Sequence, residues 1–101
     1  GSDRHMPHLQ FTGPDGVTQR FPLRHRITQI GSSRDCHLVL AGADIAPSHV
    51  TLEHEAGSYK LESSSRSTVF FVGGKKLREH VLRHGDVFVV GAVEVTFSAI
   101  D

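Results

Sequence analysis

Histidine and cysteine are the residues of this sequence best suited to bind a metal ion, and the chain has eight histidines and one cysteine. A structural zinc site needs about four ligands, commonly cysteine thiolates with histidine nitrogens. The histidines are scattered along the chain, and Cys36 adds only one thiol. We therefore expect no metal site.

The sequence also contains serine, histidine and aspartate, the residue types of a hydrolytic catalytic triad. The G-x-S-x-G motif, which presents a serine nucleophile on a strained turn, is absent from the sequence. The sequence therefore predicts no catalytic residue, no cofactor and no enzyme activity.

Length and charge limit the remaining function classes. The 101 residues suffice for one domain with one core, and 11 basic residues balance 11 acidic ones. A nucleic-acid-binding module normally carries a basic excess, and no stretch has the roughly 20 apolar residues of a membrane span. A lone cysteine fits a reducing, cytoplasmic compartment. Residues 1–6 (GSDRHM) are typical of a cloning remnant, so we assign the domain to residues 7–101.

Short stretches of alternating apolar and polar residues, separated by turn residues, dominate the chain. We expect strands at residues 8–12, 17–21, 27–30, 37–40, 50–53, 59–62, 68–72, 75–77, 87–90 and 93–97. Residues 77–82 favour a strand plus a loop, with a short helix as the lesser option. This pattern predicts an all-β fold, a two-sheet antiparallel β-sandwich of about ten or eleven short strands.

Two details of this pattern are specific. Gly73-Gly74 suits a tight primed hairpin turn, because both residues tolerate positive φ angles. Residues 87–90 (VFVV) are apolar on both faces, which is typical of a central strand of a sandwich.

The glycine, aspartate and histidine residues of the connecting loops form an ordered set. Its members are Ile30-Gly31, Asp35-Cys36 before Leu38 and Leu40, His49, Gly74, Leu82 with Gly85-Asp86, and Gly91. This set resembles the forkhead-associated (FHA) domain, a small β-sandwich that reads phosphothreonine peptides, over about residues 27–97. The resemblance implies framework roles for Gly31, His49, Gly85 and Asp86.

The departures from the family pattern fall on positions that contact the phosphopeptide. Ser32 stands where the pattern has its phosphate-binding arginine, and Ala46-Pro47 replaces its serine and arginine. Thr68 stands near the position of the asparagine that holds the peptide backbone. Similar gaps occur in the FHA domains attached to some kinesin motors.

Neighbouring residues offer compensation for the missing donors. A phosphothreonine needs a guanidinium or ammonium group together with hydroxyl donors. Candidate peptide-binding residues are Ser32, Ser33, Arg34, Ser48, Arg66 and Thr68. The same residues are also ordinary for polar loops.

Two functions therefore remain open. The first is an interaction module of FHA type, with a divergent phosphothreonine site, that binds a protein partner with weak or no phosphate dependence. That partner could be another part of the same protein. The alternative is a working phosphothreonine-peptide reader that uses Arg34 and the neighbouring loop hydroxyls. Both belong to protein–protein interaction in signalling.

Overall fold

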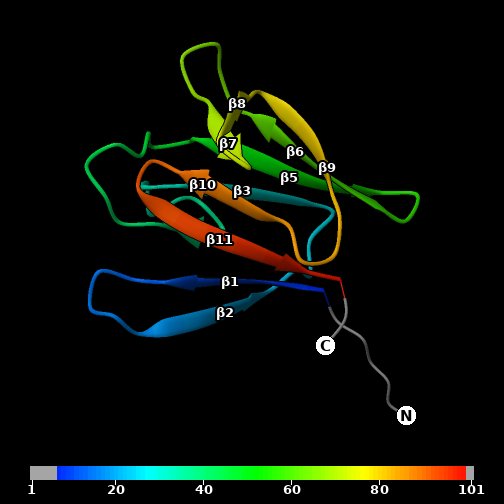
Figure 1. Cartoon of the computed structure of the whole chain (residues 1–101), viewed down its shortest axis with the longest axis horizontal. Coiled ribbons are helices and arrows are strands. Elements are labelled where there is room, and N and C mark those ends of the chain that lie inside the picture. The colour runs from blue at the N-terminus through cyan, green and yellow to red at the C-terminus, as the bar shows by residue number, and fades with distance from the viewer. Residues whose placement is uncertain (1–6, 100–101) are drawn as a thin grey trace.

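The computed structural model describes residues 7–99, so the interpretation of residues 1–6 as a cloning remnant lies outside the described residues. The described chain consists of eleven strands joined by loops (Figure 1). They are β1 (His8–Thr12), β2 (Thr18–Pro22), β3 (Ile27–Gly31), β4 (Leu38–Val39), β5 (Val50–Glu55), β6 (Ser58–Ser63), β7 (Phe70–Val72), β8 (Lys75–Leu77), β9 (Glu79–Leu82), β10 (Val87–Val90) and β11 (Val93–Ser98).

The strands form two sheets that pack face to face. The six-stranded sheet has the order β2-β1-β11-β10-β7-β8, and the five-stranded sheet has the order β4-β3-β5-β6-β9. All pairs are antiparallel except β3 with β4, which is parallel. The predicted all-β sandwich is confirmed, and none of the described residues forms a helix able to cross a membrane.

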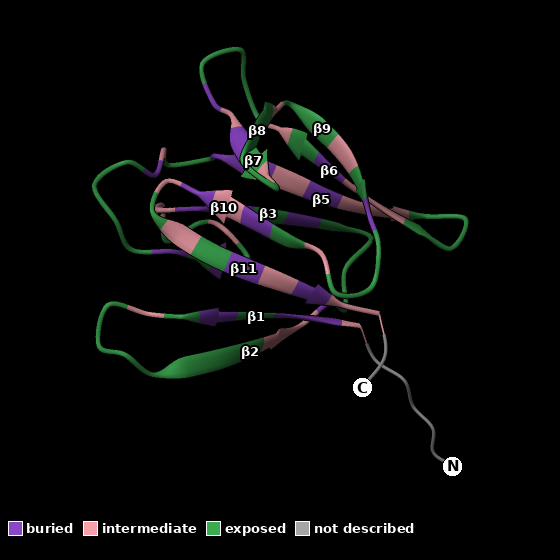
Figure 2. Ribbon diagram, viewed as in Figure 1, coloured by how far each residue is buried: buried purple, intermediate pink, exposed green. Residues whose placement is uncertain are grey.

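Apolar side chains from the two inner faces fill the space between the sheets. Phe70, Phe88 and Phe97 are essentially inaccessible to solvent, and the rings of Phe70 and Phe88 meet edge to face at 6.5 Å. Burial alternates along most strands, as the two-residue period of a strand requires (Figure 2). Burial of these rings is a large part of what stabilises the domain.

The local predictions have mixed outcomes. Gly73 and Gly74 have φ angles of +59° and +82°, which fits the expected primed turn between β7 and β8. Residues 79–82 form a strand, so the helical option is wrong. Residues 87–90 form β10, which lies between β11 and β7 and is therefore a central strand, as predicted. Its inward side chain Phe88 is buried, whereas Val87 on the outer face is 39% exposed.

Candidate functional site

Three loops meet at one end of the sandwich, and we call this surface the loop end. It consists of the β3–β4 loop (32–37), the β4–β5 loop (40–49) and the β6–β7 loop (64–69). The amide of Ser32 donates to the Ala46 carbonyl at 3.0 Å, and the amide of Ser64 donates to the His49 carbonyl at 3.0 Å. These backbone bonds hold the first loop to the second and the second to the third.

Gly31 permits the contact between the first two loops. A Cβ atom at this position would lie 2.1 Å from the Pro47 carbonyl oxygen and 2.9 Å from the Ala46 carbonyl oxygen. The amide of Ser33 donates to the same Pro47 oxygen at 3.1 Å. The two backbones can approach this closely only because residue 31 has no side chain.

His49 connects the second loop to the third from beneath. It is 7% exposed, and its Nδ1 atom accepts a hydrogen bond from the Ala46 amide at 3.0 Å. Nδ1 therefore carries no proton in this arrangement, so Nε2–H donates to the Val69 carbonyl at 2.8 Å. Both ring nitrogens are used inside the protein and neither faces a ligand.

The loop hydroxyls are mostly engaged with one another or with the backbone. Ser48 Oγ donates to Ser64 Oγ at 3.1 Å, and Thr51 Oγ1 lies 3.4 Å from the same oxygen. Ser33 Oγ accepts the amide of Asp35 at 3.1 Å. A hydroxyl has one proton to donate, so Ser48 has already used its donor within the loops.

Two arginines flank these hydroxyls. Arg34, in the first loop, and Arg66, in the third, are exposed. Neither guanidinium forms an ion pair or a hydrogen bond with a residue that the structure describes. Arg78 Nη2 donates to the Arg66 carbonyl at 2.6 Å and thereby ties the third loop to the start of β9. The loop end thus presents two exposed cations that no described residue holds in place.

Thr68 lies apart from the exposed candidates. It is 5% exposed, and its Oγ1 accepts the Ser65 amide at 3.1 Å and donates to the Ser65 carbonyl at 3.2 Å. The hydroxyl closes a turn within its own loop. The structure therefore brings Ser32, Ser33, Arg34, Ser48 and Arg66 to the surface of the loop end and places Thr68 beneath it.

A hollow of about 320 Å³ lies beside these loops and was not predicted from the sequence. Its lining residues come from the second loop, the third loop, β7 and the β10–β11 turn: Asp44, His49, Ser67, Val69, Phe71 and Gly91. Gly91 has a φ of +60° and touches the second loop, since a Cβ there would lie 3.1 Å from the Asp44 carbonyl oxygen. The hollow can receive a small apolar side chain next to one carboxylate.

The single thiol of the loop end is not activated. Burial raises the pKa of Cys36, the nearby Asp35 carboxylate raises it further, and a hydrogen bond with the backbone of Ser33 opposes them. The Sγ atom lies 3.0 Å from the Pro47 carbonyl oxygen as a donor. A protonated thiol is a poor nucleophile, so Cys36 acts as a loop contact.

His80 and His84 are separated by three residues, a spacing seen in metal sites, but their ring nitrogens bind within the protein. His80 Nε2 lies 3.1 Å from Asp86 Oδ2, and His84 Nδ1 accepts the Ala99 amide at 3.1 Å. Among the described residues, no group of three or more histidine, cysteine, aspartate or glutamate side chains is arranged to hold a metal ion.

Gly85 and Asp86 form the turn before β10. Gly85 has a φ of +90°, and its amide donates to the Phe97 carbonyl at 2.8 Å. The Asp86 carboxylate accepts the Arg83 amide at 2.9 Å. Partial burial acts to raise the pKa of Asp86, but the hydrogen bonds from Arg83 and His80 and their positive charges outweigh it, so the pKa is lowered.

Asp86→Ala should lower the free energy of unfolding near neutral pH by about 1–2 kcal/mol, because it removes charge-assisted hydrogen bonds at a partly exposed site. A carboxyl group with a lowered folded-state pKa stabilises the protein above its unfolded pKa of about 3.9, and this contribution is lost as pH falls through the folded-state pKa. Urea unfolding should therefore show a larger difference between wild type and variant at about pH 7 than at about pH 3.

Asp35→Ala is the matched control, since the exposed Asp35 carboxylate accepts no hydrogen bond from the described residues. It should leave the stability nearly unchanged at both pH values. A stable Asp86→Ala protein that has lost a peptide affinity would contradict the structural role of Asp86.

Comparisons with known proteins agree on one kind of domain. A family model described as the cytoplasmic domain of an inner membrane component of the T3SS matches residues 11–101. A search of curated proteins found no match.

Several solved structures share the fold. The FHA domain of CT664 from Chlamydia trachomatis has a TM-score of 0.83 at 17% identity, covering 95% of this chain and 99% of that chain. The Slr1951 protein from Synechocystis sp. has a TM-score of 0.82 at 21% identity, covering 91% and 96%. The yeast Dun1 FHA domain, solved with a doubly phosphorylated peptide derived from Rad53, has a TM-score of 0.74 at 24% identity, covering 97% and 77%.

Proposed function

Because this chain belongs to the family of T3SS inner-membrane-component cytoplasmic domains, which are FHA-type domains, we propose that it is a protein-interaction module and not an enzyme. Its loop end binds a segment of a protein partner, from another protein or from another part of its own, with weak or no dependence on phosphate. The family description also favours a cytoplasmic location.

The observation that carries this proposal is the internal use of two backbone amides and one hydroxyl of the loop end, which a phosphate would otherwise take as hydrogen-bond donors. The amides of Ser32 and Ser33 donate to carbonyls of the second loop, and Ser48 donates to Ser64. A hydrogen bond to a charged group contributes roughly 1.5–3 kcal/mol. A phosphate at the loop end would have to break existing bonds to obtain such contacts, so its net gain is small.

The loop end still offers features that a peptide can use. The hollow beside Phe71 and Val69 can bury a small apolar side chain, and Asp44 at its wall favours a neighbouring donor. Arg34 and Arg66 are exposed and can pair with acidic side chains of the partner. Each exposed ion pair of this kind contributes only about 0–1 kcal/mol to binding. Such pairs therefore influence which peptides are preferred more than how tightly they bind.

The second candidate is a phosphothreonine reader centred on Arg34, and it is favoured because the guanidinium of this exposed residue is not bonded to any described residue. Arg34 is two residues later than the family's phosphate-binding arginine, which displaces it by roughly 6–7 Å in extended chain. A long side chain can recover part of this distance at a cost in rotamer freedom.

Calorimetric titration of an oriented phosphothreonine peptide library and its unphosphorylated counterpart tests both candidates. We expect weak binding with a phosphate preference below about tenfold, or about 1.4 kcal/mol. Arg34→Ala should abolish whatever preference exists, whereas Arg24→Ala, which changes an exposed arginine between β2 and β3 at the opposite end of β3, should not alter it.

The other outcomes separate the candidates. A strong phosphate preference that disappears in Arg34→Ala would establish the phosphothreonine reader. Tight, phosphate-dependent binding that survives Arg34→Ala would show that the site lies elsewhere on the domain.

A further inference from the structure

Four side chains form a row across the outer face of the six-stranded sheet. Strand register places Lys76 on β8 beside Phe71 on β7, Phe71 beside Val89 on β10, and Val89 beside Glu94 on β11. We call these four residues the β8–β11 row. In order across the sheet, the row consists of a cation, two apolar residues and an anion.

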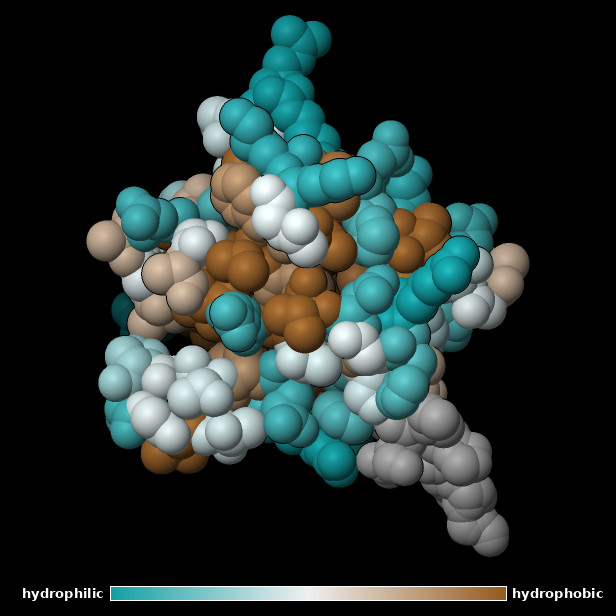
Figure 3. Space-filling model, in the orientation of Figure 1, coloured by the Kyte–Doolittle hydropathy of each residue, from teal (hydrophilic) through white to brown (hydrophobic). Residues whose placement is uncertain are grey.

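The centre of this row is unusually apolar for an exposed sheet face. Phe71 is 37% exposed, and Val87, which lies two residues from Val89 on the same face of β10, is 39% exposed. The space-filling view shows apolar surface gathered in the middle of this face with hydrophilic side chains around it (Figure 3). The core requires apolar residues only on the inner face of β10. The apolar residues on its outer face are explained if this surface is an interaction surface.

The two charges of the row have no partners within the described residues. Lys76 and Glu94 lie three strand spacings apart, about 14 Å, which is too far for an ion pair between them. The ion pairs among the described residues involve other side chains, such as Lys60 with Glu79 on the five-stranded sheet at 3.0 Å. An apolar centre flanked by one unpaired cation and one unpaired anion is complementary to itself.

We propose that the occupant of this face is a second copy of the chain, related by a two-fold axis that runs along the strands between β7 and β10. This rotation reverses the row, so Lys76 of each copy meets Glu94 of the other. Phe71 of each copy then packs against Val89 of the other, and every contact occurs twice, as an isologous interface requires.

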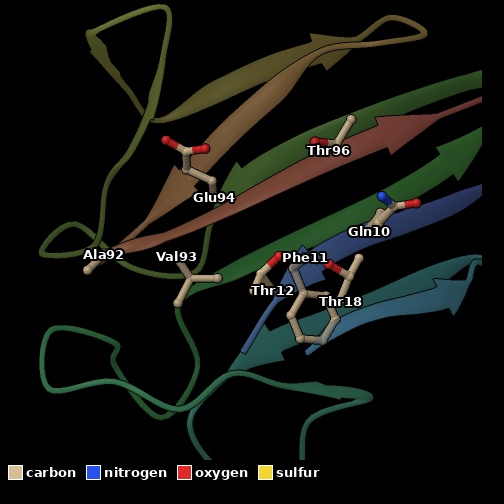
Figure 4. A pocket seen from close by; sticks show the side chains of 8 residues that line it. All are labelled: Gln10, Phe11, Thr12, Thr18, Ala92, Val93, Glu94 and Thr96. Carbon is tan, nitrogen blue, oxygen red and sulfur yellow. Dashed lines mark hydrogen bonds between the residues drawn. The ribbon is translucent and has the colours of Figure 1, made fainter. Parts of the chain in front are cut away.

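The surface around Glu94 fits this arrangement. A polar hollow of about 340 Å³ lies over β11, β1 and β2 next to Glu94, and Gln10, Thr12, Thr18 and Thr96 help to line it. Figure 4 shows these side chains on the neighbouring strands around the hollow. The same rotation places the β8 edge of the second copy above this hollow, where hydroxyl and amide oxygens can accept the Lys76 ammonium.

The area of this face determines how strongly we expect two copies to associate. Stable complexes bury about 800 Å² on each partner, and one face of this short-stranded sheet offers less. The dimer should therefore be weak, with a dissociation constant of roughly 0.1–1 mM, and should loosen at high salt because charge pairs at its rim are screened.

Sedimentation equilibrium of the whole chain at protein concentrations from about 10 µM to about 1 mM tests the proposal. This range covers the dissociation constants that we expect for a small interface. Lys76→Glu and Glu94→Lys should each weaken dimerisation at least about tenfold, because each replaces two attractive pairs by two repulsive ones. The double variant Lys76→Glu with Glu94→Lys should restore it. Circular dichroism of these exposed-site variants checks that each is folded.

Lys75→Glu is the matched control, since Lys75 pairs with Val72 and not with the row. It should change dimerisation less than Lys76→Glu does. A wild-type protein that is monomeric at every concentration would overturn the proposal, and so would a dimer that the double variant fails to restore.

Discussion

Gly31→Ala should destabilise the domain by about 3–5 kcal/mol, a large part of the roughly 5–15 kcal/mol that stabilises a typical domain. The new Cβ would lie 2.1 Å from the Pro47 carbonyl oxygen and 2.7 Å from its carbonyl carbon. Both are backbone atoms, held in place by hydrogen bonds from Ser33 and Cys36. The clash can be relieved only by separating the first and second loops, which breaks these bonds. Urea unfolding measures the loss.

Gly57→Ala is the control that separates steric contact from backbone strain. Gly57 has a φ of +83° but nothing within 4 Å of an added Cβ. Its substitution should cost only about 1–2 kcal/mol, the price of a left-handed conformation for an L-residue. If Gly31→Ala were no worse than Gly57→Ala, the first two loops would be able to part at little cost.

The strands were predictable because each follows from local chemistry. Side chains alternate in and out of a sheet with a period of two, and turn residues such as Gly73 and Gly74 interrupt this period where their φ angles are needed. The loops were predictable only in position, from the ordered set of glycine, histidine and aspartate residues. Their hydrogen bonds depend on contacts between residues far apart in the chain.

The state of the candidate site could not be predicted for that reason. The sequence does not show that Ser48 donates to Ser64, sixteen residues away, or that Thr68 is buried within its own turn. Nor does it reveal the hollow beside Phe71, whose lining comes from four separate segments. Sequence identifies the residue types of a site, whereas tertiary contacts decide which donors remain free.

The same limit applies to β10. Four consecutive apolar residues are typical of a central strand, and β10 is central, yet only Phe88 and Val90 face the core. Val89 pairs with Phe71 on the outer face, where Val87 is also exposed, and this arrangement emerged only from the strand order and register. An apolar run can therefore signal an interface as well as a core.

His49→Leu should cost about 2–4 kcal/mol although it places an apolar side chain of similar size at this buried position. Leucine cannot accept from the Ala46 amide or donate to the Val69 carbonyl, so two buried backbone groups lose their partners. Each such loss costs about 1–3 kcal/mol. Because His49 joins the second loop to the third, we also expect the Ala46 amide to exchange its hydrogen faster in the variant.

His84→Leu is the matched control for this substitution. His84 also accepts a backbone amide, that of Ala99, but it is exposed, so water replaces the lost bond and the cost should stay below about 1 kcal/mol. His49→Gln should recover part of the stability, because its amide group carries both an acceptor and a donor. Equal stability of the His49 and His84 variants, with unchanged exchange at Ala46, would mean that backbone bonds alone hold the loop end together. The hydrogen bonds from Ser32 to Ala46 and from Ser64 to His49 would then be enough to hold the three loops together without the imidazole.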